Sequence, residues 1–312
     1  MLYIVLECLW HFRVVVSDYF AVFSKWKEHL EYLRRTFQRC RETGLKLHPG
    51  KCFMGMISGI LLGHIVSRNG LEVDSDKVRA ILILVSPTNV REVRGFLGCV
   101  GYYRRFIGAY AKLAAPLTEL LKKEEEFVWT ERRQQAFEEL KKTLTTAPIL
   151  SAPDWSEEFH VTIDASGWCL GAILWQQGGV QKEHPIYYAS RQMSLAERKY
   201  TTTEREALAV VYACKKFRHY LLGYKVIFHT DHDSLKYLVN KPDLSGRIAR
   251  WILLLQEFNY EVVVKPGKAN ANAAYLSRMH GPEAVSDIPA TFPDAFPEEA
   301  TVFPSSGTGD TD

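Results

Sequence analysis

Residues 162–174 read TIDASGWCLGAIL and join the first two strands expected in the C-terminal half of the chain. The alternating segment Phe159–Asp164 is the first strand, and Gly171–Gln176 is the second. Apolar residues recur at helical spacing over Thr202–Leu222. The remaining elements are predicted as strands at 185–190, 226–231 and 260–265 and as helices at 233–239, 245–258 and 270–279. Strands on both sides of a long helix indicate an α/β domain with a mixed sheet.

The pattern nearest the N-terminus is also mixed. Residues 14–23, VVVSDYFAVF, predict one strand, or two strands hinged at Ser17-Asp18. An amphipathic helix follows, because apolar residues recur at spacings of three and four between Trp26 and Cys40. Gly44 is placed to end that helix.

A hairpin and a helical region connect these two parts. Residues 60–73 predict the hairpin, with Asn69-Gly70 in its turn. From 74 to 146 the pattern is helical, and Ser75 and Thr88 are the candidate N-caps.

The net charge is unevenly distributed. The 312 residues carry 39 Lys+Arg and 36 Asp+Glu, a formal +3. Residues 279–312 hold seven of the acids and no Lys or Arg, so the rest of the chain carries 39 − 29 = +10. A basic body suits a polyanion such as nucleic acid. The alternative is a generic solvated surface, and charge alone does not separate the two. The Pro-rich acidic tail is expected to be disordered.

Composition excludes several classes of protein. An apolar fraction of 47% and a charged fraction of 24% are those of a globular chain. The apolar opening Met1–Leu6 is too short to span a bilayer and lacks the features of a secretory signal, so no membrane partner is expected. The six cysteines are far apart with no C-x-x-C, which favours a reducing compartment, the cytoplasm or nucleus.

Three acids lie where a metal site could form. Asp164 ends an alternating strand, Glu206 lies in the first turns of the long helix, and Asp231 ends the next strand. Such carboxylates repel one another unless divalent cations lie between them, and Mg²⁺ prefers oxygen ligands. Two such ions can activate water against a phosphodiester. The alternative is that Glu206 interacts with the helix dipole while the two aspartates form turns.

The chain resembles the C-terminal part of a Ty3/gypsy-type retrotransposon reverse transcriptase. The resemblance covers roughly residues 17–278. It is carried by stretches that include KEHLEYLRRTFQRCRETGLKLHPGKC, LLGHIVSRNGLEVDSDKVRAI, SPTNVREVRGFLGCVGYYRRFI, TIDASGWCLGAIL, YTTTEREALAVV, KKFRHYLLG and HTDHDSLKYL. It implies an α/β (α+β) chain with a truncated palm remnant (1–74), a helical thumb/connection (75–148), an RNase H-like domain with a mixed five-stranded sheet and flanking helices (149–279), and a tail (280–312).

The resemblance assigns roles to the acids. Asp164, Glu206 and Asp231 match the catalytic and metal-binding acids of the family's RNase H domain, which uses Mg²⁺ or Mn²⁺. The family's fourth acid belongs where this chain has Ala274. The expected function is therefore hydrolysis of the RNA strand of RNA–DNA hybrids by a two-metal mechanism, with impaired activity.

The polymerase site is degenerate by the same comparison. Where the family has a Y-x-D-D turn, this chain retains Asp18 but has Tyr19 in place of the second Asp. The fingers and most of the palm have no counterpart, so polymerase activity is expected to be absent. Gly63 and His64 resemble a hairpin that contacts the primer.

Basic residues are candidates to bind nucleic acid. In the helical region, Arg104 and Arg105 are the main candidates, and Arg91, Arg94 and Lys112 can also face phosphates. In the RNase H-like region the candidates are Lys215, Lys216, Arg218, Arg247 and Arg250. For each residue the alternative is a solvated helix face.

Two further functions stay open. A non-catalytic nucleic-acid-binding remnant, domesticated or decaying, is favoured by Ala274 and Tyr19. A structural protein that recruits a partner through its acidic tail has no specific support.

Overall fold

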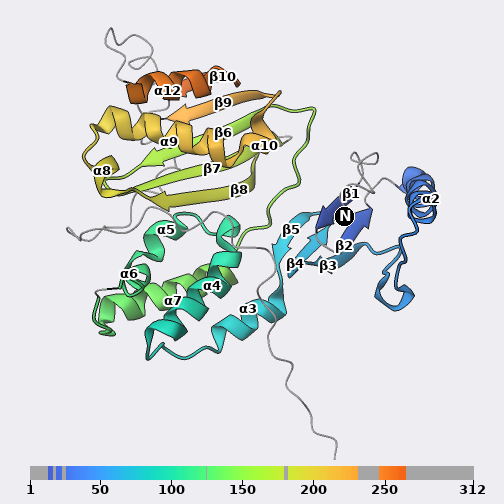
Figure 1. Cartoon of the computed structure of the whole chain (residues 1–312), viewed down its shortest axis with the longest axis horizontal. Helices are drawn as coiled ribbons and strands as arrows, with labels where there is room; N and C mark the ends of the chain where they lie inside the picture. Colours follow the sequence, from blue (N-terminus) through green and yellow to red (C-terminus); the bar gives the residue numbers. More distant parts are fainter. Residues whose placement is uncertain are drawn as a thin grey trace, which may run out of the picture. The chain divides into compact units, whose positions relative to one another are not determined.

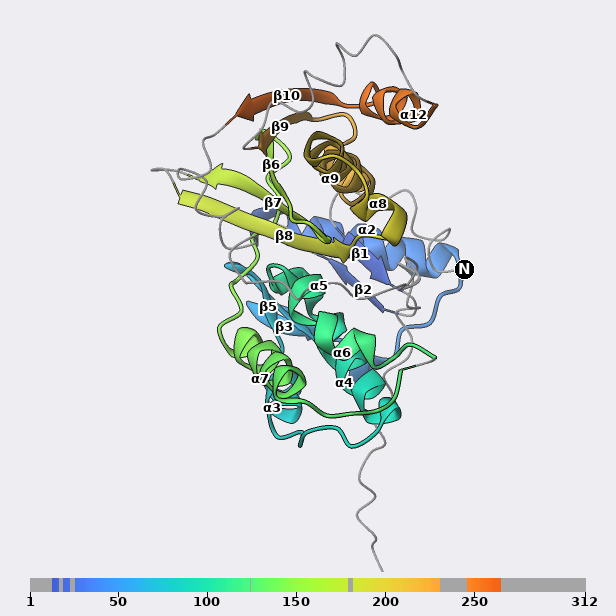
Figure 2. The same ribbon diagram turned by 90° about the vertical axis from the view of Figure 1, so that its left-hand side faces the viewer.

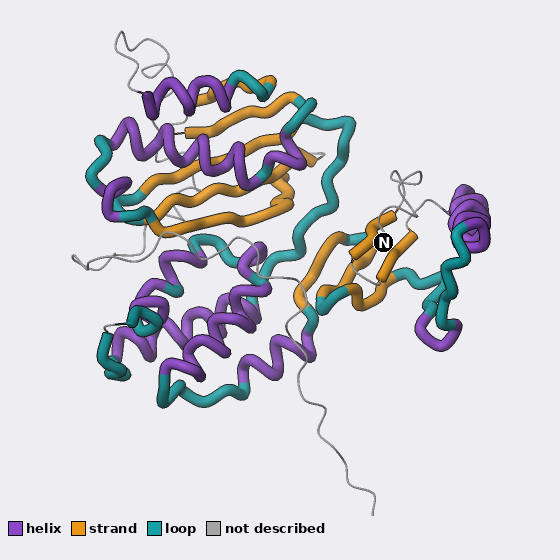
Figure 3. Tube along the Cα trace, viewed as in Figure 1, coloured by secondary structure: helices purple, strands orange, loops and turns teal. Residues whose placement is uncertain are grey.

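The computed structural model describes residues 13–16, 19–22, 26–123, 125–178, 182–230 and 246–264. The chain divides between Ile57 and Ser58 into two compact units. Helices and strands occur in both units (Figure 3).

The first unit holds a short hairpin and a long helix. Strands β1 (Arg13–Val16) and β2 (Tyr19–Val22) are antiparallel, with Val16 opposite Tyr19. The segment is therefore two strands rather than one, while Asp18 itself lies outside the described residues. Helix α2 (Trp26–Glu42) follows, and the chain leaves it through Gly44 at a φ of +67°, a conformation that glycine adopts without strain. A single 3₁₀ turn, η2 (Pro49–Lys51), comes next.

The second unit begins with three antiparallel strands. They are β3 (Ser58–Leu61), β4 (His64–Ser67) and β5 (Gly70–Val73), in the order β3-β4-β5. The sequence predicted only the Asn69-Gly70 turn. A second turn lies at Leu62-Gly63, where both residues have positive φ, 48° and 68°. Leucine is an unusual residue at positive φ, and only Gly63 and the resemblance to a hairpin at Gly63 and His64 pointed to this turn.

The helical segment packs around its own core. Its elements are α3 (Ser75–Leu82), α4 (Val90–Tyr102), η3 (Arg104–Phe106), α5 (Tyr110–Leu113), α6 (Ala115–Glu119) and α7 (Glu131–Thr145). The predicted N-caps were each wrong by one residue. Asp74 accepts a bond from the Asp76 amide, and Asn89 accepts one from the Glu92 amide. None of the described helices is long and apolar enough to cross a lipid bilayer.

A five-stranded mixed sheet follows, as predicted. Its strands are β6 (Phe159–Ala165), β7 (Cys169–Gly178), β8 (Lys182–Gln192), β9 (Lys225–Thr230) and β10 (Asn259–Val264), in the order β10-β9-β6-β7-β8 (Figure 1). Strands β10, β9 and β6 are parallel, whereas β7 and β8 are antiparallel to their neighbours. This arrangement confirms the expected α/β class with an RNase H-like mixed sheet.

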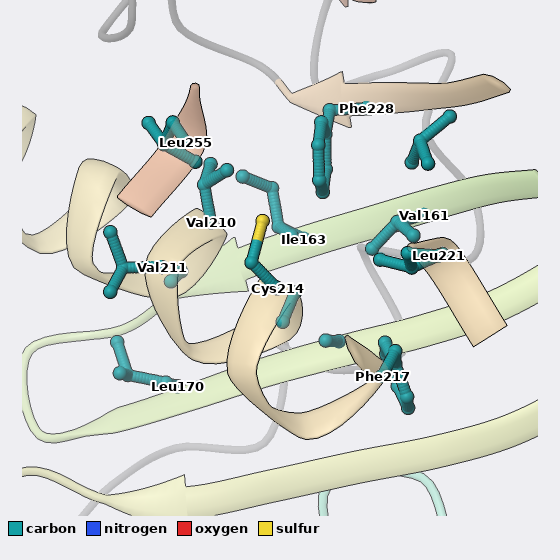
Figure 4. Packing of buried hydrophobic residues seen from close by; sticks show 14 of the residues in the cluster. Val161, Ile163, Leu170, Val210, Val211, Cys214, Phe217, Leu221, Phe228 and Leu255 are labelled. Atoms are coloured by element: carbon teal, nitrogen blue, oxygen red, sulfur yellow. The ribbon is translucent and has the colours of Figure 1, made fainter. Parts of the chain in front are cut away.

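Helices cover one face of that sheet. They are α8 (Leu195–Arg198), α9 (Thr202–Lys216), α10 (Arg218–Leu221) and α12 (Gly246–Leu255) (Figure 2). The predicted long helix is interrupted at Phe217, and α8 was not predicted. Val210, Cys214 and Phe217 of the helices pack against Ile163 and Leu170 of the strands (Figure 4). The helices predicted at 233–239 and 270–279 lie outside the described residues.

Helix α5 contacts the sheet from the opposite face. The amide of Ala111 donates to the Ser190 Oγ at 2.9 Å, and the Gln192 side chain donates to the Ala111 carbonyl at 3.2 Å. Ala109 packs with Ile173 and Trp175. The helical segment therefore lies against strands β7 and β8.

Candidate functional site

Asp164 lies near the end of the central strand, β6. Side chains along a strand alternate between faces. Val161 and Ile163 point into the core under α9 (Figure 4), so Thr162 and Asp164 face the other side. The Asp164 carboxyl is half-buried there.

Glu206 is fixed by the start of its helix and by the neighbouring strand. Helix α9 begins with a capping box between Thr201 and Glu204, which places Glu206 in the second turn. Its side chain is only 5% exposed. The hydroxyl of Thr230, fully buried at the end of β9, donates to the Glu206 Oε2 at 3.1 Å. The parallel register, with Thr162 opposite His229, puts Thr230 at the same end of the strands as Asp164, on the face that α9 covers.

The donor set at this edge suits a hard divalent cation. Two carboxylates from adjacent elements offer oxygen ligands of the kind that Mg²⁺ and Mn²⁺ take. Asp231 directly follows Thr230 in the chain, but it and Ala274 lie outside the described residues. Within the described ranges no group of three or more His, Cys, Asp or Glu side chains could hold a metal ion. Two of the three predicted ligands thus lie near the same end of the strands, Glu206 on the α9 side and Asp164 on the other face.

A buried lysine and a buried thiol lie in the field of Asp164. Lys112, of α5, is only 8% exposed. Burial lowers the pKa of Lys112, and the charges of Cys169 and Asp164 oppose that shift. Burial raises the pKa of the Cys169 thiol to about 12, and the Asp164 carboxylate adds to the shift. The suggestion that Lys112 faces phosphate on an open helix surface is therefore wrong, because its side chain is buried beside the sheet.

Two histidines join the strands that carry the acids. The Nδ1 of His160 and the Nε2 of His229 lie 2.9 Å apart in a hydrogen bond between β6 and β9. Trp175 stacks on His160 with a centroid distance of 4.3 Å, and its Nε1 donates to the Thr162 Oγ1 at 3.0 Å. The sequence prediction missed this polar layer, whose only signal was polar residues at alternate strand positions.

The structure brings together two basic residues that are 111 positions apart in the chain. Arg105 of η3 lies over the ring of Tyr187 at 4.9 Å, and Lys216 of α9 lies over the same ring at 5.8 Å. Burial lowers the pKa of His219, and the nearby charges of Lys216 and Arg105 lower it further. The helical segment and the end of α9 thus form one basic surface around Tyr187.

Gly63 and His64 are held by tyrosines from α4. The Tyr103 hydroxyl donates to the Gly63 carbonyl at 2.8 Å, and that of Tyr102 donates to the Leu62 carbonyl. Burial lowers the pKa of His64 to about 4, with a further contribution from Arg105. Arg105 is therefore electrostatically coupled both to this turn and to the basic surface around Tyr187.

The other basic candidates differ in their contacts and in their exposure. Arg247 pairs with Glu204 at 2.8 Å and lies over the Tyr200 ring at 4.0 Å, contacts that stabilise the helix pair. Arg218 pairs with Glu257. Lys215 and Arg250 are exposed, whereas Arg104 is half-buried.

Comparison with known proteins identifies the domain that carries the acids. The RNase H-like domain found in reverse transcriptase matches residues 154–258, which contain both Asp164 and Glu206. This part of the chain is similar in sequence to that domain. The strand order β10-β9-β6-β7-β8 and the position of helix α9 across the sheet agree with an RNase H-like fold.

The relatives of the whole chain are retrotransposon polyproteins. The chain is 38% identical over 271 residues to the retrovirus-related Pol polyprotein from transposon 297 of Drosophila melanogaster. The aligned region covers 86% of this chain and 25% of that protein. It is 33% identical over 273 residues to the transposon Tf2-7 polyprotein of Schizosaccharomyces pombe, covering 85% and 20%. The chain thus spans a quarter or less of these two relatives. They confirm the resemblance to Ty3/gypsy-type elements.

Solved structures share the fold. A foamy viral protease-reverse transcriptase in complex with RNA/DNA hybrid has a TM-score of 0.74 at 22% identity, covering 93% of this chain and 39% of that one. The same kind of protein in complex with double-stranded DNA has a TM-score of 0.71 at 22% identity, covering 85% and 47%. At this identity the similarity concerns the fold alone.

Proposed function

We propose that the RNase H-like domain hydrolyses the RNA strand of RNA–DNA hybrids with Mg²⁺ or Mn²⁺, and that its activity is impaired. Asp164, Glu206 and Asp231 are the proposed ligands. The observation that carries the proposal is the buried Glu206 carboxylate, fixed by Thr230 at the end of β9, next to the strand end that carries Asp164. Carboxylate oxygens of this kind are the ligands that Mg²⁺ and Mn²⁺ take, which supports a metal role.

The residues have distinct tasks in this chemistry. Divalent ions bound there would lower the pKa of a water and stabilise the leaving oxygen. Asp164 would hold its ligand geometry through the rigid central strand, and Thr230 would keep the Glu206 oxygens oriented. The chain has Ala274 where the family has a fourth carboxylate, which leaves the second ion with fewer charged ligands.

Binding of the hybrid would use the basic surface around Tyr187. Arg105 and Lys216 converge there, and phosphate contacts of this kind give affinity without sequence choice. The foamy viral relative in complex with RNA/DNA hybrid supports this substrate by analogy. The other basic candidates, Lys215, Arg218, Arg247, Arg250, Arg104, Gly63 and His64, would extend the surface.

A binding assay tests this surface. Replacing both Arg105 and Lys216 by Gln should weaken hybrid binding by about tenfold or more, since two phosphate contacts are lost. The matched control is Lys225→Gln, because Lys225 is already paired with Glu158 at 2.7 Å and Glu261 at 3.3 Å. If the double replacement and Lys225→Gln weaken hybrid binding equally, the proposed surface is wrong.

The second candidate function is binding without catalysis. The replacement of the family's fourth acid by Ala274 favours it, as does Tyr19 at the polymerase turn. A nuclease assay on a labelled hybrid separates the two, since only the enzyme cleaves in the presence of Mg²⁺ or Mn²⁺ and stops with a chelator.

Polymerase activity is proposed to be absent. Asp18 remains at the degenerate turn, but Tyr19 cannot replace a carboxylate that binds a metal ion. Primer extension by the purified protein should be undetectable, and any template-dependent DNA synthesis would contradict this. We place the protein in the cytoplasm or nucleus, where its widely spaced cysteines stay reduced and nucleic acid is available.

A further inference from the structure

Lys112 belongs to the helical segment, yet it lies on the face of the sheet that carries Asp164. Across the sheet, Asp164 pairs with Gly171 of β7, and Gly171 pairs with Ser190 of β8. The neighbours of these residues, Ile163, Leu170 and Ala189, belong to the core under α9. Asp164, Gly171 and Ser190 therefore form a row on the opposite face.

Helix α5 is anchored at the end of that row. The Ala111 amide donates to the Ser190 Oγ at 2.9 Å, and Gln192 donates to the Ala111 carbonyl. Lys112 is the next residue. Between Ser190 and Asp164 the row holds only Gly171, which has no side chain.

Because Lys112 is buried, the charges around its ammonium group matter. A lysine that is 8% exposed is costly unless negative charge compensates its ammonium group. Asp164 is near enough to supply part of that charge: burial lowers the pKa of Lys112, and Cys169 and the Asp164 carboxylate oppose the shift. Helix α5 thus brings a positive charge to the face of the sheet that carries Asp164, one of the proposed metal ligands.

We propose that Lys112 is a built-in cation of the carboxylate site, contributed by the helical segment to the RNase H-like domain. The inference rests on the proposed metal site at Asp164. Lys112 offsets part of the Asp164 carboxylate charge and so takes over part of the role that a second metal ion would have there. The helical segment is then part of the site and not only a connector.

Metal affinity tests the proposal without reference to cleavage. Mn²⁺ binding is measured by calorimetry on the full chain and on Lys112→Met, which keeps the side-chain length and removes the charge. Loss of a positive charge beside Asp164 should tighten Mn²⁺ binding by about tenfold, because like charges no longer repel. Lys112→Arg should bind as the starting protein does.

Lys141 provides a matched control. It lies in the same helical segment, is 7% exposed, and donates to the Leu84 carbonyl at 2.6 Å while its ammonium lies 4.2 Å from the Phe137 centroid. Lys141→Met removes an equally buried charge, and Mn²⁺ affinity should not change. Equal Mn²⁺ affinities for Lys112→Met and the starting protein would overturn the inference.

A second measurement covers the case in which Lys112→Met does not fold. In the starting protein labelled with ¹⁵N-lysine, bound Mn²⁺ should broaden the side-chain signal of Lys112, assigned with Lys112→Arg, and spare that of Lys141. A sharp Lys112 signal would contradict the inference. Asp164→Asn separates the two proposals: if it leaves Mn²⁺ binding intact, the metal site itself is wrong, whatever Lys112 does.

Discussion

His64, which follows the Leu62-Gly63 turn, makes the stability of the folded chain depend on pH. Its ring lies among Tyr102, Tyr103 and Phe106, with centroid distances of 5.0, 5.5 and 5.7 Å. Burial lowers its pKa from 6.5 to about 4, and Arg105 adds to the effect. As the pH falls below 6.5, the unfolded chain takes up a proton at this residue before the folded chain does. Stability is therefore lost between pH 6.5 and about 4 and levels off below that.

This shift gives a measurable pH dependence. Between pH 7.5 and pH 5, His64 should contribute up to about 2 kcal/mol to the loss of unfolding free energy. In urea titrations His64→Gln should lose less stability than the starting protein over that interval. The exposed His184 of β8 is the control position, and His184→Gln should keep the full pH dependence. Parallel pH curves for His64→Gln and the starting protein would show that this residue is not the source.

Some residues of the site could be predicted from sequence, and others could not. Asp164 lies at a strand end and Glu206 lies near the start of a helix, and each position is defined by one segment of sequence. Thr230, Lys112 and Tyr187 act through contacts with residues 24 or more positions away. Such contacts depend on sheet register and on the packing of α5, which no local pattern encodes.

At the scale of elements, the strand β5 is tied to the linker that leads into the RNase H-like domain. Leu71 and Leu150 exchange two backbone hydrogen bonds, at 2.7 and 2.9 Å. Gly70 permits this approach. Its φ is +132°, and a Cβ there would lie 2.1 Å from the Leu150 carbonyl oxygen.

Gly70→Ala should therefore destabilise the chain by at least about 2 kcal/mol, through both backbone strain and the clash with Leu150. Thermal unfolding measures the effect. Gly59→Ala in the neighbouring β3 is the control, since a Cβ at Gly59 meets nothing within 4 Å. If the two variants melt together, the bridge to Leu150 has no role in stability.

The spacing of hydrophobic residues predicted the order and type of most helices and strands, but it did not predict the caps and turns at their ends. The caps of α3 and α4 lie at Asp74 and Asn89, one residue before or after the predicted Ser75 and Thr88, because neighbouring polar residues can equally serve as caps. The Leu62-Gly63 turn depends on bonds from Tyr102 and Tyr103, which lie 40 positions later. Long-range contacts decided both its place and its conformation.

At the scale of the whole molecule, charge should govern binding. The chain outside the tail carries +10. Hybrid affinity should fall by roughly 100-fold between 50 and 200 mM salt, as counterion release requires. Fluorescence anisotropy measures this fall, and a flat salt response would rule out a basic binding surface.

The acidic tail should oppose that binding. Residues after Gly281 carry seven acids, which compete with phosphates for the basic surface. Removing them should tighten hybrid binding modestly at low salt, and the difference should shrink as salt screens the charges. Unchanged affinity after truncation would show that the tail does not reach the surface.

The measurement that tests the account most directly is single-turnover cleavage of a labelled RNA–DNA hybrid by three proteins. The starting chain should cleave slowly and favour Mn²⁺, which tolerates an imperfect oxygen site better than Mg²⁺. Ala274→Asp should accelerate cleavage by about tenfold or more, because the restored carboxylate completes the site. Asp164→Asn should abolish cleavage. If all three proteins are folded and inert, the enzyme proposal is contradicted and a binding remnant remains; if Asp164→Asn cleaves as fast as the starting chain, the site is elsewhere.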